Sequence, residues 1–176
     1  MKPAPARSSP STAASTAASV LDHRSVAYRA FTGPVIPAAA ANSPGWRSAD
    51  LGGGNGHGNA SALVELFAPL TTGSLLKSST VDLIFDEQSN GPDLVHGRHT
   101  RWGIGFALPD PRTLPWIPSG RVAFWGGWGG SMLIADLDRQ LTIGYVMNDL
   151  GTDLLGGERA AAYVTAIYAA LVARCR

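Results

Sequence analysis

The sequence offers few residues whose types and spacing could carry out chemistry, and the densest group is a glycine-rich run. Residues 50–58 read Asp-Leu-Gly-Gly-Gly-Asn-Gly-His-Gly. A phosphate-binding loop would need a Lys-Ser or Lys-Thr pair after the glycines and a buried strand before them, and the sequence has neither. Glycines at this density more often serve tight turns and close backbone packing. We therefore interpret the run as a loop.

The histidines and the single cysteine do not form a catalytic or metal-binding set. A histidine that acts as a general base needs a nucleophile within hydrogen-bond reach, and none is identifiable for His57. His96 and His99 lie in a stretch rich in Pro, Gly and Arg, which predicts solvated side chains, and the spacing of the three histidines does not indicate zinc. Cys175 is alone, so no internal disulfide can form. We expect neither a metal nor a cofactor.

Length and composition indicate one folded domain. The chain has 176 residues, of which 45% are hydrophobic and 15% charged, a balance that suits a globular protein with its own core. The net charge of +1 gives no reason to expect nucleic acid or an anionic membrane as a partner. No apolar run approaches the roughly 18 residues that a membrane-spanning helix needs.

The first segment differs from the rest. Residues 1–20 consist almost entirely of Ala, Ser, Pro and Thr, which predicts a disordered tail. Lys2 and Arg7 give a basic start, but no apolar region of the kind found in secretory signals follows. We therefore expect a cytoplasmic protein, with residues 21–176 forming a partial domain.

Helices are expected on either side of a group of strands. Prolines exclude a long helix from residues 21–58, and Asn59 is a good cap for a helix that follows with Glu65 on its exposed face. A short helix is expected over residues 79–86 and a long amphipathic helix over residues 158–174. The residues expected to face the core are Leu63, Leu66, Phe67 and Leu70 in the first helix and Ala161, Val164, Ile167, Tyr168 and Leu171 in the last.

Four strands are expected between these helices, over residues 102–108, 121–125, 131–136 and 141–148. Short links join the last three, which predicts an antiparallel meander. The simplest interpretation of Asp136, Asp138 and Arg139 is a solvated hairpin turn. Helices that bracket an antiparallel sheet predict an α+β layered fold.

Separated segments of the sequence resemble the β-lactamase-like serine hydrolases. The run Phe124-Trp-Gly-Gly-Trp-Gly-Gly-Ser131, the pair Ala135-Asp136 and the run Gly144-Tyr-Val-Met-Asn148 are similar to the end of that family. Upstream segments over residues 37–42, 55–60 and 101–106 fit the same family in the same order. Class C β-lactamases and family VIII carboxylesterases are the most similar branch. The resemblance implies an incomplete β-lactamase/transpeptidase-like fold.

The resemblance also implies a site. In this family a serine forms an acyl-enzyme and backbone N–H groups hold the oxyanion. Trp125, Gly126 and Gly127 stand where β-lactamases have Lys-Thr-Gly, and Trp128 follows with the N–H that serves as oxyanion donor. Tryptophan in place of lysine removes the cation that would bind a β-lactam carboxylate, which favours esters. The sequence is also compatible with a crowded, purely structural strand at this position.

The sequence departs from the family at the nucleophile. The family's Ser-X-X-Lys motif precedes the Asn-Gly-His-Gly segment by a long way, and no match occurs there in this chain. The one literal match, Ser74-Leu-Leu-Lys77, lies after that segment, in a connection that varies within the family. We therefore do not interpret Ser74 and Lys77 as the catalytic pair.

Three functional hypotheses remain open. The chain is the C-terminal half of a serine hydrolase, inactive and marginally folded alone, whose N-terminal half is absent or supplied in trans. Alternatively, it is a non-catalytic module that binds a small ester or amide, or a short hydrolase that uses Ser74 and Lys77.

Overall fold

The computed structural model describes residues 22–33, 37–54 and 56–174, and the expected tail and Cys175 lie outside these ranges. The chain divides into two compact units. One comprises Met1–Asn55 with Pro92–His99, and the other comprises Gly56–Gly91 with Thr100–Arg176. All residues singled out by the resemblance at 55–60 and beyond 100 fall in or next to the second unit.

The described part of the first unit contains only short helices. They are α2 (Val26–Phe31), the 3₁₀ helix η1 (Ala38–Asn42) and α3 (Pro44–Ser48). Serine hydroxyls cap α2 and α3 by accepting hydrogen bonds from backbone N–H groups of the first turn. Proline is tolerated at the first position of α3, where its missing N–H would have no partner.

The strands form a six-stranded antiparallel sheet in which they follow one another in chain order. Its strands are β1 (Ser89–Pro92), β2 (His99–Trp102), β3 (Ala107–Leu108), β4 (Val122–Gly126), β5 (Met132–Asp136) and β6 (Leu141–Tyr145). The last three form the expected meander, since each pairs with the next along its whole length.

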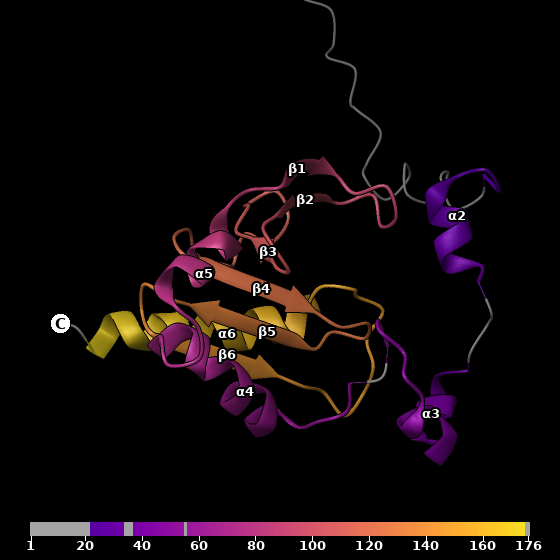
Figure 1. The fold of residues 1–176 in the computed structure, drawn as a ribbon, viewed down its shortest axis with the longest axis horizontal. Coiled ribbons are helices and arrows are strands. Elements are labelled where there is room, and N and C mark those ends of the chain that lie inside the picture. Colours follow the sequence, from indigo (N-terminus) through magenta and orange to yellow (C-terminus); the bar gives the residue numbers. More distant parts are fainter. Residues whose placement is uncertain (1–21, 34–36, 55, 175–176) are drawn as a thin grey trace, which may run out of the picture. The chain divides into compact units, whose positions relative to one another are not determined.

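Helices lie on both faces of the meander (Figure 1). One face carries α4 (Ala60–Thr72), α5 (Ser78–Asp82) and the 3₁₀ turn η2 (Leu83–Phe85), and the other carries α6 (Gly157–Arg174). The expected α+β fold of an antiparallel sheet flanked by helices is therefore confirmed. No helix in the described ranges has the length and apolarity to cross a bilayer.

Two apolar cores separate these layers because successive residues of β4 point to opposite faces. Val122 and Phe124 are fully buried and belong to the larger core, which includes Val164 of α6. Ala123 belongs to the smaller core beneath α4, α5 and η2. The residues Val122, Ala123 and Phe124 thus contribute alternately to the two cores.

The helix that begins after Asn59 confirms its predicted cap but not all of its predicted packing face. The Asn59 side chain accepts a hydrogen bond from the Ala62 N–H, and Gly73 ends the helix in the left-handed conformation. Leu70 is buried, whereas Leu66 is 63% exposed because it faces away from the sheet. The expected helix over 79–86 begins earlier, at Ser78, and tightens into η2 at Leu83.

The single strand expected over residues 102–108 is wrong. The Gly103 N–H donates to the Phe106 carbonyl, so the chain turns between β2 and β3. A side chain at Gly103 would overlap the backbone carbonyl of Ile84, and Gly105 has a φ of 79°. The alternation of large and small residues reflects a tight turn against η2 rather than a continuous strand.

Candidate functional site

The end of β4 exposes backbone groups on its side away from β5. Backbone hydrogen bonds run from Leu137 N to Arg121 O and from Gly127 N to Ser131 O, each 2.9 Å long. Odd-numbered residues of β4 therefore direct their N–H and C=O groups toward β5, since the bonding direction alternates along a strand. The backbone groups of Gly126 consequently point to the opposite side.

On that opposite side, β3 stops short of Gly126. The register between the two strands contains the single pair Ala107 and Phe124. The chain before Ala107 forms the turn that starts at Gly103, and it does not continue the ladder. Among the described residues, no strand therefore pairs with Gly126 on this side, and an extended ligand could form main-chain hydrogen bonds there.

A tight turn follows β4 and presents Trp128. The Gly130 N–H donates to the Gly127 carbonyl at 3.0 Å, which closes a four-residue turn. Gly129 and Gly130 have φ values of 93° and 111°, which glycine adopts without strain. The Trp128 side chain is 74% exposed. The turn thus places the Trp128 backbone immediately beyond the open edge at Gly126.

Close internal packing accounts for the glycines at 126 and 127. A Cβ atom at Gly126 would lie 2.9 Å from the Met132 sulfur and 3.1 Å from the Leu154 carbonyl oxygen. A Cβ atom at Gly127 would collide with the Ser131 hydroxyl. The chain's own atoms therefore occupy the Cβ positions of both glycines, and a ligand would use the strand edge rather than either face of the strand.

Trp125 forms an apolar wall next to the edge. Its ring centroid lies 4.5 Å from that of Trp102, which comes from β2. Both rings pack on the larger core and are partly buried. An aromatic pair at this separation adds about 0.5–1.5 kcal/mol to the energy of burial. The pair makes the surroundings of Gly126 apolar, which suits an uncharged ligand.

A cavity of about 320 Å³ lies beyond the turn. Gly129 and Gly130 of the turn line one part, and the first residues of α6, including Glu158 and Arg159, line another. The Arg159 guanidinium donates to the Asp149 carbonyl oxygen at 2.6 Å. The cavity therefore combines glycine backbone with two acidic residues, Asp153 and Glu158, and with one basic side chain that is already hydrogen-bonded.

The structure does not bring Ser74 and Lys77 together as a catalytic pair. Both side chains are exposed, and residues 73–77 are not helical, so a spacing of three does not place them on one helical face. The Ser74 hydroxyl lies 3.1 Å from the Thr72 hydroxyl, and the Ser74 N–H donates to the Pro69 carbonyl. Ser74 therefore belongs to the C-terminal cap of α4.

Two expectations about charged surface residues are wrong. The His96 side chain is only 10% exposed; its Nδ1 accepts from the Arg98 N–H, and its Nε2 lies 3.4 Å from an Asp93 oxygen. Desolvation lowers the pKa of His96. Within the described ranges, no group of three His, Cys, Asp or Glu residues could hold a metal ion.

Asp136 is the second correction, because it is fully buried instead of solvated. Its carboxylate accepts hydrogen bonds from the Arg139 backbone N–H at 3.0 Å, the Arg139 guanidinium at 2.9 Å and the Tyr168 hydroxyl at 3.0 Å. Burial first, and then the Asp136 charge, raise the pKa of Tyr168. These contacts tie the β5–β6 hairpin to α6, and the sequence shows no signal of them.

Replacing Asp136 by alanine is expected to lower the free energy of unfolding by about 1.5–3 kcal/mol, because hydrogen bonds to a buried charge are lost. Urea unfolding measures the change, and Glu65→Ala, at an exposed site on α4, is the matched control with an expected change within about 0.5 kcal/mol.

Tyr168 is expected to make the stability of the protein depend on pH in alkali. Because folding raises the pKa of Tyr168, the contribution of its hydroxyl to stability is present below its unfolded pKa and is lost as the pH rises through the folded value. Wild type should therefore lose stability in alkali more steeply than Tyr168→Phe, and equal slopes would contradict this role.

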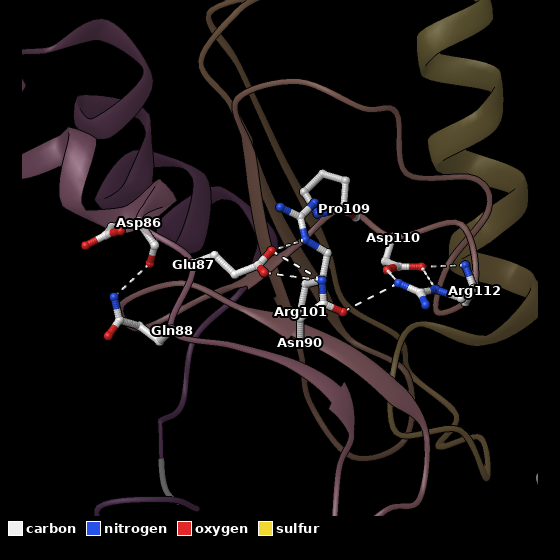
Figure 2. Close-up of polar contacts among 8 residues, drawn as sticks. All are labelled: Asp86, Glu87, Gln88, Asn90, Arg101, Pro109, Asp110 and Arg112. Atoms are coloured by element: carbon white, nitrogen blue, oxygen red, sulfur yellow. Dashed lines mark hydrogen bonds and ion pairs between the residues drawn. The ribbon is translucent and has the colours of Figure 1, made fainter.

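A second polar network, which the sequence analysis missed, holds the first strands (Figure 2). Arg101 of β2 donates to a Glu87 carboxylate oxygen at 2.6 Å and to the Pro109 carbonyl at 2.8 Å. Arg112 makes a two-pronged contact with the buried Asp110, at 2.9 and 2.6 Å. Figure 2 shows these pairs on neighbouring segments around β2. They support the strands next to the Trp102–Trp125 pair.

Comparisons with known proteins place this arrangement in context. A protein-family model described as Beta-lactamase matches residues 3–166. The solved structure of a family VIII carboxylesterase superposes with a TM-score of 0.75 at 29% identity, over 81% of this chain. A novel penicillin-binding protein homolog from Caulobacter crescentus gives a TM-score of 0.71 at 33% identity, also over 81% of this chain. No curated protein matches.

The matched part is a minor share of the solved structures. The chain covers 40% of the carboxylesterase and 39% of the penicillin-binding protein homolog. The fold agrees with the expected β-lactamase/transpeptidase-like arrangement, represented here in part.

Proposed function

Since the chain belongs to the beta-lactamase family, we propose that it forms the carbonyl-binding part of a serine hydrolase that acts on esters. We assign only a part of the hydrolase to this chain, because the chain spans about 40% of the length of the solved structures it matches. In this proposal the strand edge at Gly126 and the backbone of Trp128 bind the substrate. The attacking serine comes from a polypeptide segment outside this sequence.

The observation that carries the proposal is the open edge at Gly126. Its backbone N–H and C=O groups point to the side of β4 away from β5. On that side the described residues provide no partner strand for Gly126. Trp128 follows two residues later in a glycine-rich turn, so its N–H can lie near a carbonyl bound at this edge. Backbone N–H groups that are fixed before the reaction stabilise the oxyanion without reorganising. This supports the role of Trp128 as an oxyanion donor.

An uncharged ester fits the surroundings of the edge. Trp125 stands where β-lactamases have a lysine, and its ring packs against Trp102 instead of offering a positive charge. The solved structure with a TM-score of 0.75 is, by its name, a carboxylesterase. Both points favour an ester over a β-lactam, whose carboxylate would need a cation.

An external nucleophile agrees with the position of Ser74. That serine follows the C-cap of α4, its hydroxyl lies 3.1 Å from the Thr72 hydroxyl, and no hydrogen bond joins it to a lysine within the described ranges. A serine needs an adjacent base to become a nucleophile at neutral pH. In this proposal the chain alone therefore performs no hydrolysis, although it retains the carbonyl-binding edge.

Labelling with a fluorophosphonate, followed by intact mass measurement, tests this division of roles. The chain alone is expected to remain unlabelled. The chain mixed with the portion of the family VIII carboxylesterase that it does not match is expected to hydrolyse a p-nitrophenyl ester, with one adduct on the added portion. The added portion alone is the control. An adduct on Ser74 in the chain alone would overturn the proposal and assign the chemistry to this chain.

A further inference from the structure

The turn that joins β1 to β2, residues 93–98, is closed by hydrogen bonds among its own residues. The Asp93 N–H donates to the Arg98 carbonyl and the Gly97 N–H donates to the Asp93 carbonyl, each at 2.9 Å. One carboxylate oxygen of Asp93, Oδ1, accepts from the His96 N–H at 3.1 Å. Aspartate side chains that bond to the backbone after them favour such turns. The whole turn lies in the first of the two compact units.

The imidazole of His96 is part of this hydrogen-bonded turn. The Arg98 N–H donates to its Nδ1 at 3.2 Å, so Nδ1 acts as an acceptor and carries no proton. In the neutral ring the proton is then on Nε2, which lies 3.4 Å from the other carboxylate oxygen of Asp93, Oδ2. Both ring nitrogens therefore face groups of the turn, and one tautomer is fixed by the backbone.

A second proton can bind to the ring only at Nδ1. There it would occupy the lone pair that accepts the Arg98 N–H, and two N–H groups would face each other. The hydrogen bond and the added proton therefore exclude one another.

The charges around the ring act in both directions. Desolvation lowers the pKa of His96, the Asp93 charge opposes this shift, and the Arg98 charge adds to it. Within the described part of the chain, Asp93 and Arg98 are the charged groups that act on this imidazole. The net result is that the closed turn disfavours the protonated ring.

We propose that His96 is a proton-operated latch of the turn between β1 and β2. The neutral ring holds the Arg98 N–H and keeps the turn closed, whereas a proton at Nδ1 releases that N–H and opens the turn. Asp93 stabilises the protonated ring, because its carboxylate lies next to the imidazole. The proposal does not depend on the proposed hydrolase function.

The direction of the pH dependence follows from the lowered pKa. The closed turn binds the proton less tightly than the open turn does. Its stability is therefore fully present above the pKa of the open form, and it is lost as the pH falls toward the lower pKa of the closed form. The latch is closed in neutral and alkaline solution and opens in mild acid.

Hydrogen exchange of the Arg98 amide, measured by NMR on the full chain between about pH 8 and pH 5, tests the proposal. Protection is expressed relative to an unstructured peptide at the same pH, which removes the intrinsic pH dependence of exchange. Uptake of one proton on opening should lower this protection by up to about tenfold per pH unit in mild acid. Protection that stays constant over the range would overturn the proposal.

Nitrogen NMR of the imidazole gives an independent check that needs no variant. At neutral pH the His96 ring should carry its proton on Nε2, with Nδ1 unprotonated. A ring that is protonated at Nδ1 at this pH would overturn the proposal, because the Arg98 N–H would then have no acceptor there.

Three variants assign the pH dependence to the latch. His96→Asn offers an oxygen that accepts but does not titrate, so the protection of Arg98 should become independent of pH. Asp93→Asn keeps an acceptor for the turn but removes the charge beside the ring, so the midpoint should move to lower pH. His57→Asn removes an exposed imidazole elsewhere and should behave like wild type. A pH dependence that survives His96→Asn, or a midpoint that Asp93→Asn leaves unchanged, would contradict the latch.

Discussion

Replacing Phe124 by alanine is expected to lower the free energy of unfolding by about 3–5 kcal/mol, the usual cost of removing a buried phenylalanine. Phe124 is fully buried at the centre of β4 and packs in the core between the sheet and α6. Its neighbours are held by strands and a helix, so they can fill the space only in part. Urea unfolding followed by circular dichroism measures the loss.

Phe31→Ala is the matched control for this variant. Phe31 lies at the end of α2 and is 41% exposed, so the same substitution should cost under about 1 kcal/mol. Because a typical domain has only about 5–15 kcal/mol of stability, we expect the Phe124 variant to lie near the threshold of unfolding. Equal losses in the two variants would contradict the assigned core.

Replacing Trp128 by proline is expected to reduce ester hydrolysis by about 10²–10³-fold in the mixture with the complementing esterase portion. Proline has no N–H, so it removes the proposed oxyanion donor directly. The second residue of a four-residue turn favours proline, so the turn between β4 and β5 should persist. The measurement is kcat for a p-nitrophenyl ester.

Trp128→Ala distinguishes the contribution of the Trp128 N–H to kcat from that of its indole. Alanine keeps the N–H and removes an indole that is 74% exposed, so its kcat should remain within a few-fold of wild type. If alanine and proline reduce kcat equally, the indole rather than the N–H matters, and the oxyanion assignment fails. Thermal melting of both variants confirms that the comparison concerns folded protein.

The meander and α6 could be predicted because local patterns determine them. Residues 121–125, 131–136 and 141–148 alternate in strands joined by short links, and the structure confirms all three with the last one ending earlier, at Tyr145. Of the predicted packing face of α6, Val164 is fully buried and Ala161 is partly buried, and Ala160 beside it is also fully buried. In these elements the pattern of apolar residues and the tertiary packing agree.

The sequence predictions were wrong where residues far away in the chain determine the local structure. The Ile84 carbonyl, which excludes a side chain at Gly103, turns the expected strand of 102–108 into two short ones. Asp136 resembles any hairpin aspartate in the sequence, and its burial depends on Tyr168 of α6. The residues of the candidate edge were found through a family resemblance. The side to which the backbone N–H and C=O groups of Gly126 point follows from the β4–β5 register, which a sequence pattern alone does not supply.

The Trp102–Trp125 pair has a spectroscopic consequence. Two indoles with centroids 4.5 Å apart are close enough for their electronic transitions to couple, which produces paired bands of opposite sign in circular dichroism. Trp125 immediately precedes Gly126, so a ligand at that edge would change the angle or polarity of the pair. The protein thus contains a built-in optical reporter of binding at its candidate site, and it needs no added dye.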